Sequence, residues 1–116
     1  MAQRETPAPL SCPLPASGDT LMRSLTLIYH EIFEDDIARI VQQQMGVARY
    51  TKIRDVVGAR LDTMTETDYA PTHHNHLLIL VADCGTVQAI AAALKDLREK
   101  KGHGLRGYIS PVEDII

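Results

Sequence analysis

The chain has 116 residues, of which 45% are hydrophobic and 23% are charged, and its formal net charge is −3. It is long enough for one domain with a buried core, and its charged fraction is typical of a folded protein rather than a disordered chain. The negative net charge argues against a nucleic-acid-binding protein, which depends on a basic surface. No apolar stretch is long enough to cross a bilayer or to act as a secretory signal, so we expect a cytoplasmic protein without membrane insertion.

The two cysteines, Cys12 and Cys84, are too few for a disulfide scaffold or a four-cysteine zinc site. Cys12 lies in a proline-rich segment. Cys84 stands at the start of a predicted helix, where it fills a small cap position or, alternatively, is a reactive thiolate. Since nothing in the sequence holds the two residues within ~7 Å of each other, we expect no disulfide between them. This expectation agrees with a reduced, intracellular setting.

The N-terminal segment, residues 1–22, is rich in proline, and it contains four of the six prolines in the chain: Pro7, Pro9, Pro13 and Pro15. Proline removes a backbone donor and interrupts both helices and strands, so we predict a flexible tail here. The folded domain is predicted over residues 23–116.

The first half of this domain contains two predicted strands and one helix. Residues 25–29 are almost all apolar and indicate a strand. Acidic residues 34–36 begin a helix, whose apolar positions recur every three or four residues until Gly46. Residues 47–55 alternate and indicate a second strand. The connection at residues 56–74 has no period, and its length is typical of a functional loop or of disorder.

The second half repeats the order of strand, helix and strand. Residues 76–82 form an apolar run that indicates a buried strand, and Asp83 is the expected helix cap. The helix that follows is amphipathic and continues to Lys101 with a basic last turn, which suits the helix dipole. A glycine-rich turn at residues 102–107 precedes a short strand at residues 108–110.

This order of elements predicts a ferredoxin-like α+β fold, βαββαβ, with both helices on one face of a four-stranded antiparallel sheet. The first and third strands should lie side by side in the centre. Both are apolar on nearly every residue, so the face away from the helices needs a cover that the chain itself does not provide. We therefore expect self-association through the open face of the sheet.

Three motifs resemble the PII signal-transduction proteins. They are the strand end at residues 81–83 leading into a helix, the glycine-rich turn at residues 102–107, and the Pro-Val-Glu ending at residues 111–113. The resemblance covers about residues 24–116. It implies a homotrimer that binds an adenine nucleotide (ADP, AMP or ATP) in clefts between subunits. The loop at residues 56–74 would then engage a partner such as a membrane transporter or a metabolic protein.

Two departures indicate a divergent PII-like member rather than a nitrogen regulator. The basic residues that follow the position of Ile116 in nitrogen-sensing members are missing, and the loop lacks their tyrosine-centred pattern, although Tyr69 lies near its end. Some divergent members accompany bicarbonate transporters, and others accompany metal-efflux systems. The trimeric CutA proteins share the fold.

The resemblance implies two groups of nucleotide-binding residues. Arg106 aligns with the phosphate-holding lysine of the family, and Gly58 and Arg60 stand where the loop begins. The predicted set is Gly58, Arg60, Lys101, Gly102, His103, Gly104 and Arg106. Glycines allow close approach of the backbone to an anion, and an arginine can bind phosphate with two donors. The alternative for the turn is a basic helix end with a glycine cap, and for the loop start it is a turn glycine beside a solvated arginine.

Histidines form a second candidate site. His30 ends the first strand and His76 begins the third, so they could face each other across the ladder; the candidate metal ligands are His30, His73, His74 and His76. Imidazole is a common ligand of divalent metals. The spacing matches no recognised zinc signature, and polar residues at a loop–strand junction are the alternative.

No catalytic motif is present, and the acidic residues 34–36 receive no catalytic role, so we do not expect an enzyme. The leading hypothesis is a PII-like sensor in which an adenine nucleotide, with a small anion such as bicarbonate as a candidate second ligand, switches the 56–74 loop. The alternatives are a CutA-like or metal-efflux-linked trimer that binds divalent metal, and a structural interaction module without a small ligand.

Overall fold

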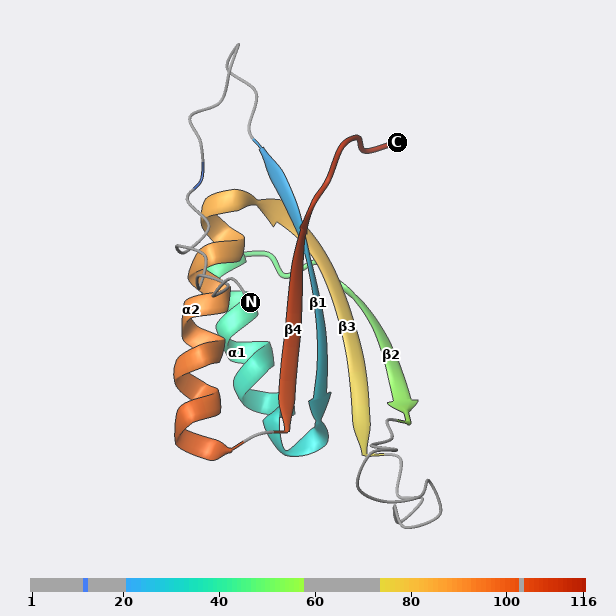
Figure 1. The fold of residues 1–116 in the computed structure, drawn as a ribbon, viewed down its shortest axis with the longest axis vertical. Coiled ribbons are helices and arrows are strands. Elements are labelled where there is room, and N and C mark those ends of the chain that lie inside the picture. Colours follow the sequence, from blue (N-terminus) through green and yellow to red (C-terminus); the bar gives the residue numbers. More distant parts are fainter. Residues whose placement is uncertain (1–11, 13–20, 58–73, 103) are drawn as a thin grey trace, which may run out of the picture.

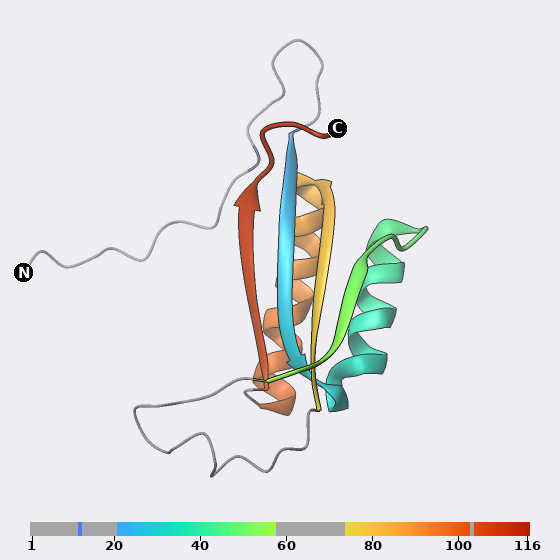
Figure 2. The same cartoon turned by 90° about the vertical axis from the view of Figure 1, so that its right-hand side faces the viewer.

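The computed structural model describes residue 12 and residues 21–57, 74–102 and 104–116. Two helices cover one face of a four-stranded antiparallel sheet, and the strand order is β2-β3-β1-β4 (Figures 1 and 2). The predicted ferredoxin-like arrangement is therefore confirmed. The elements in chain order are β1 (Met22–His30), the 3-10 turn η2 (Glu31–Phe33), α1 (Glu34–Met45), β2 (Thr51–Val56), β3 (Asn75–Asp83), α2 (Cys84–Lys101) and β4 (Leu105–Pro111).

The core lies between the sheet and the helices, and the two-residue period of the strands selects its members. Alternate residues of β1 and β3 face the helices and are buried, whereas their neighbours face away. Side chains of both helices complete the layer. The buried apolar residues of this core are Leu25, Leu27, Tyr29, Phe33, Ile37, Val41, Leu78, Leu80, Ala82, Val87, Ile90, Leu94 and Leu105.

The helix ends follow the sequence signals. Gly46 ends α1 with a φ of 75°, a left-handed conformation that glycine adopts without a steric cost. Asp83 caps α2: its carboxylate accepts hydrogen bonds from the backbone N–H of Thr86 at 3.1 Å and from the Thr86 hydroxyl at 2.6 Å. These hydrogen bonds from Thr86 lower the pKa of Asp83. The predicted cap at Asp83 is therefore confirmed.

The open face of the sheet is less uniformly apolar than the sequence pattern implied. In β1 this face carries Ser24 and Thr26 before Ile28, so β1 alternates in the ordinary way and the prediction of two apolar faces is wrong for this strand. In β3 the prediction holds, because Leu77, Ile79 and Val81 all face away from the helices. We call the open-face patch the group formed by Ile28, Ile53, Leu77, Ile79, Val81 and Tyr108.

All four strands have limits that differ from the sequence prediction, and β1 already begins at Met22 rather than residue 25. β2 begins at Thr51 rather than residue 47, and β4 extends over Leu105–Pro111 rather than residues 108–110. The glycines of residues 102–107 indicated a turn, so the sequence did not reveal that β4 already includes Gly107, which pairs with Leu27. A β-bulge separates Ile53 from Val56, and Asp55 there has a φ of 61°. Within the described part of the chain, no helix is long and apolar enough to span a membrane.

Cys12 and Cys84 form a disulfide, so the expectation of two unpaired cysteines is wrong. Their Cα atoms lie 5.7 Å apart, within the usual range for a bridge. The sheet explains the proximity, because Met22 at the start of β1 pairs with Asp83 at the end of β3. The backbone N–H of Cys84 donates to the carbonyl of Leu21 at 2.9 Å, which holds the chain before β1 against the start of α2. A disulfide also gives no support to the expected reducing environment.

Candidate functional site

Six element ends meet at one end of the molecule, which we call the loop end. β1, β2 and α2 finish there, and α1, β3 and β4 begin there (Figures 1 and 2). Residue 57 directly follows β2 and residue 74 directly precedes β3, so both ends of the β2–β3 connection also lie here. The antiparallel arrangement therefore brings the glycine-rich turn, the root of the β2–β3 connection and the histidines into one region.

The glycines of the turn after α2 are required by the backbone and by packing. Gly102 has a φ of 106° and its N–H donates to the carbonyl of Arg98 at 2.9 Å, so it closes the helix. A Cβ on Gly104 would lie 3.1 Å from the ring of Phe33 and 3.2 Å from the Cβ of His30. The Gly104 carbonyl accepts a hydrogen bond from the N–H of His30 at 2.8 Å. The predicted glycine cap is present, and it fastens the turn to the end of β1.

Arg106 is the second residue of β4 and is exposed. It pairs with Ile28 of β1, so its side chain belongs to the sheet face away from the helices. Among the described residues it has no ion-pair partner. An exposed guanidinium beside a glycine-rich turn remains available for an anion.

Lys101, in contrast, is already paired. Its ammonium group donates to the carboxylate of Asp36 at 2.6 Å, which joins the last turn of α2 to the first turn of α1. The hydrogen bonds from Lys101 and then Arg39 lower the pKa of Asp36. Lys101 therefore forms an ion pair between the two helices. Its ammonium group is less available for a phosphate than the guanidinium of Arg106.

Sequence reasoning missed a polar network beneath this region. The Tyr29 hydroxyl donates to one carboxylate oxygen of Glu34 at 2.8 Å, and Lys52 donates to the other oxygen. Burial and then the bond to Glu34 raise the pKa of Tyr29, so its hydroxyl remains a donor. The register of β2 could have indicated the role of Lys52. Lys52 pairs with Leu78, which faces the helices, so a charged side chain at this position needs a partner on the helix side of the sheet. Glu34 therefore joins β1 and β2 to the start of α1, in addition to complementing the helix dipole.

The histidines do not gather as predicted. His76 pairs with Tyr29, whereas His30 pairs with Asn75, so the two rings lie on opposite faces of the sheet. His76 is buried, contacts the Tyr29 ring at 5.8 Å between centroids, and accepts a hydrogen bond at Nδ1 from the N–H of Asp55. The prediction that His30 and His76 face each other is wrong by one residue of register, which reverses the face of every side chain.

His30 and His74 do lie together, with ring centroids 5.8 Å apart. Nδ1 of His74 lies 3.2 Å from a carboxylate oxygen of Glu31, and Nδ1 of His30 accepts the N–H of Ile32 at 3.1 Å. Within the described residues, no group of three or more His, Cys, Asp or Glu side chains is placed to hold a metal ion. The remaining predicted site residues, Gly58, Arg60, His73 and His103, lie outside the described residues.

No protein-family model matches the chain, and no curated protein sequence matches it. Several solved structures, however, do match the chain. A PII-like signalling protein from Thermus thermophilus superposes with a TM-score of 0.59 at 14% identity over 80% of this chain and 87% of that one. CPII, a nitrogen regulatory PII-like protein from Thiomonas intermedia bound to ADP, AMP and bicarbonate, has a TM-score of 0.59 at 14% identity over 81% and 90%.

The apo form of the same CPII protein has a TM-score of 0.61 at 13% identity and covers 79% of this chain and 89% of that one. These structures match most of both chains, although few residues are identical. The chain therefore has the fold of the PII-like signalling proteins.

Proposed function

We propose that this protein is a non-enzymatic PII-like regulator that binds an adenine nucleotide at its loop end. The observation that carries the proposal is the placement of Arg106, an arginine with no ion-pair partner among the described residues, in β4 next to a glycine-rich turn. This turn lies at the same end of the molecule as the β2–β3 connection. The structural likeness to CPII bound to ADP and AMP supports this choice of ligand. Arg106 would hold the phosphates through its two-donor edge.

The same proposal includes a homotrimer with the nucleotide between subunits. The open-face patch supports self-association, because Ile53, Val81 and Tyr108 are at least two-fifths exposed in the isolated chain. A bound nucleotide would then switch the 56–74 loop and so control a partner, either a membrane transporter or a metabolic protein. Bicarbonate, which is present in several CPII structures, is the proposed second ligand.

Isothermal titration calorimetry with ADP, AMP and ATP tests the nucleotide site. Arg106→Ala should weaken binding by roughly ten- to a hundredfold, since a charge-assisted contact typically contributes ~1.5–3 kcal/mol. Lys101→Ala should weaken it less, because the Lys101 ammonium group is held by Asp36. Arg49→Ala is the matched control, since Arg49 is exposed in the connection between α1 and β2 at the other end of the molecule.

Unchanged affinity in Arg106→Ala would remove the turn from the site. Absence of nucleotide binding in the parent protein would overturn the proposed function as a whole. Bicarbonate is tested by repeating the titration with sodium bicarbonate against sodium chloride of equal ionic strength. A change in nucleotide affinity specific to bicarbonate is the expected result, because two ligands that share a site are thermodynamically coupled.

A further inference from the structure

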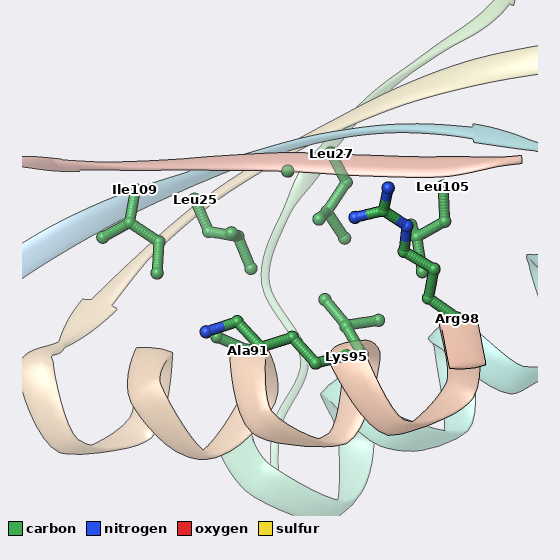
Figure 3. Close-up of a pocket in the computed structure, with 9 residues that line it drawn as sticks. Leu25, Leu27, Ala91, Lys95, Arg98, Leu105 and Ile109 are labelled. Carbon is green, nitrogen blue, oxygen red and sulfur yellow. The ribbon is translucent and has the colours of Figure 1, made fainter. Parts of the chain in front are cut away.

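A groove lies between α2 and β4, on the face of the sheet that the helices cover. Its cavity has a volume of about 130 Å³. Buried Leu25, Leu27 and Leu94 form part of its lining. The Arg98 side chain extends from α2 toward β4, and the Lys95 side chain runs along α2 toward Ala91 (Figure 3). β4 is the last strand of the sheet, so the groove is next to an edge without a neighbouring strand.

Gly107 is one reason for this space. It occupies an inward-facing position of β4 opposite Leu27, where the residues on either side in the register, Leu105 and Ile109, carry large side chains. A Cβ at Gly107 would lie 2.8 Å from a methyl group of Leu27. The groove is close in size to a cavity of about 150 Å³ that holds one benzene molecule, so it can take one large aliphatic side chain.

The charges beside the groove have no partners within the described structure. Lys100 pairs with Asp96 and Lys101 pairs with Asp36, but Lys95 and Arg98 form no ion pair there. The groove therefore combines an apolar lining with two exposed cations. Its complement is an aliphatic residue that has a carboxylate close to it in sequence.

Residues 113–116, Glu-Asp-Ile-Ile, have this chemistry. Ile115 and Ile116 are strongly exposed, and neither Glu113 nor Asp114 forms an ion pair in the described structure. In an extended segment, alternate residues share a face. Either register therefore presents one isoleucine together with the carboxylate two residues before it.

This segment cannot reach the groove of its own chain in the observed arrangement. The N–H of Val112 donates to the carbonyl of Met22 at 3.3 Å, which holds the chain beside the start of β1. From there the segment leaves on the side of the sheet away from the helices, whereas the groove lies on the helix side (Figure 1). A second copy must supply the segment.

We propose that residues 113–116 of one copy dock in the α2–β4 groove of another copy. An isoleucine enters the apolar cavity, and the carboxylates meet Lys95 and Arg98. The contact joins two different surfaces, so repetition by a three-fold rotation closes it into a ring. The inference rests on the self-association in the proposed function but is independent of nucleotide binding.

Zero-length carbodiimide cross-linking of the full chain, followed by mass spectrometry, tests the contact. An equal mixture of unlabelled and ¹⁵N-labelled protein, exchanged before coupling, should give mixed-label amide links between Lys95 and the carboxylates at residues 113–116. Lys100 is the control, since it lies on the same helix outside the groove and is paired with Asp96. Links confined to one label would place the segment in its own chain, and absence of the Lys95 link would mean an empty groove; either overturns the proposal.

Charge reversal gives a second test. Lys95→Glu with Arg98→Glu should weaken self-association by at least about tenfold in sedimentation equilibrium, because like charges then meet. Adding Glu113→Lys and Asp114→Lys should restore it, whereas Lys100→Glu should leave it unchanged. If the double reversal leaves both the trimer and ADP affinity unchanged, the docking proposal fails while the proposed function stands. If the parent protein is a monomer, both the docking and the proposed trimer fail.

Discussion

The backbone N–H of Asp55 donates a hydrogen bond to Nδ1 of His76, and the two nitrogens lie 3.2 Å apart. His76 is 6% exposed, and Asp55 has a φ of 61° at the β-bulge near the end of β2. A buried ring of β3 thus fixes the strained residue from which the chain continues toward residues 58–73. The root of the proposed switching loop is therefore hydrogen-bonded to a buried residue of the sheet.

We predict that His76→Phe destabilises the protein by ~1–3 kcal/mol, because it leaves the Asp55 N–H without its acceptor. Phenylalanine keeps an aromatic ring next to Tyr29, so the packing loss is small. Urea unfolding measures the stability, and amide hydrogen exchange at Asp55 should become faster. His74→Phe is the control, since His74 is 44% exposed and its loss should change stability by less than ~0.5 kcal/mol. Equal effects of the two variants would contradict the prediction.

Glu34 should make the free energy of unfolding decrease at acidic pH. Burial raises its pKa, but hydrogen bonds from Lys52 and Tyr29 outweigh this and leave the pKa below the ordinary 4.5. A group with a lowered folded pKa stabilises the protein above its unfolded pKa, and this contribution is lost as the pH falls through the folded value. We therefore expect the free energy of unfolding to decrease as the pH drops below about 4.5.

Glu34→Gln should reduce this acid dependence and cost ~1–3 kcal/mol at neutral pH, since Tyr29 and Lys52 lose a charged acceptor. Denaturant unfolding between pH 7 and pH 3 measures both effects. Asp35→Asn is the control, because Asp35 is an exposed acid in the same helix turn without this network. The prediction fails if both variants have the same pH profile.

The disulfide should contribute strongly to stability. Cys12 and Cys84 are 72 residues apart, and closing a loop of that length removes enough unfolded-chain entropy to stabilise the protein by about 2–4 kcal/mol. Adding dithiothreitol should therefore lower the urea midpoint of the parent protein. Cys12→Ser should have the lower midpoint from the start and should not respond to the reductant. An identical midpoint with and without reductant would show that the bridge carries no stability.

The open-face patch should drive self-association. Ile79→Asp places a charge in the centre of this patch, on β3. It should shift the proposed trimer toward monomer in sedimentation equilibrium by at least about a hundredfold in concentration, because a carboxylate would have to be desolvated at the interface. The residue is 37% exposed in the isolated chain, so the fold itself should survive. Val47→Asp, an exposed apolar residue outside the sheet, is the control. Loss of the trimer in both variants, or in neither, would contradict an interface at this patch.

The arrangement of the elements could be predicted because it depends on local signals. Apolar periodicity located both helices, Asp83 and Gly46 marked two of their ends, and the order of elements has one common antiparallel solution. At the candidate site, the glycine cap at Gly102 could be predicted, whereas Arg106 lies in β4 rather than in the predicted turn. The assignment of Lys101 did not anticipate its ion pair with Asp36, which lies 65 residues away in sequence.

The sequence alone determined the order of the elements and where the helices begin and end, since these follow from backbone sterics and local hydrogen bonds. The tertiary structure decided everything that depends on register and on long-range proximity. A shift of one residue placed His76 beside Tyr29 in the core and His30 on the other face. Pairing of Met22 with Asp83 brought the chain before β1 to Cys84. Such contacts are set by the packing of the whole sheet against the helices, and no local segment encodes them.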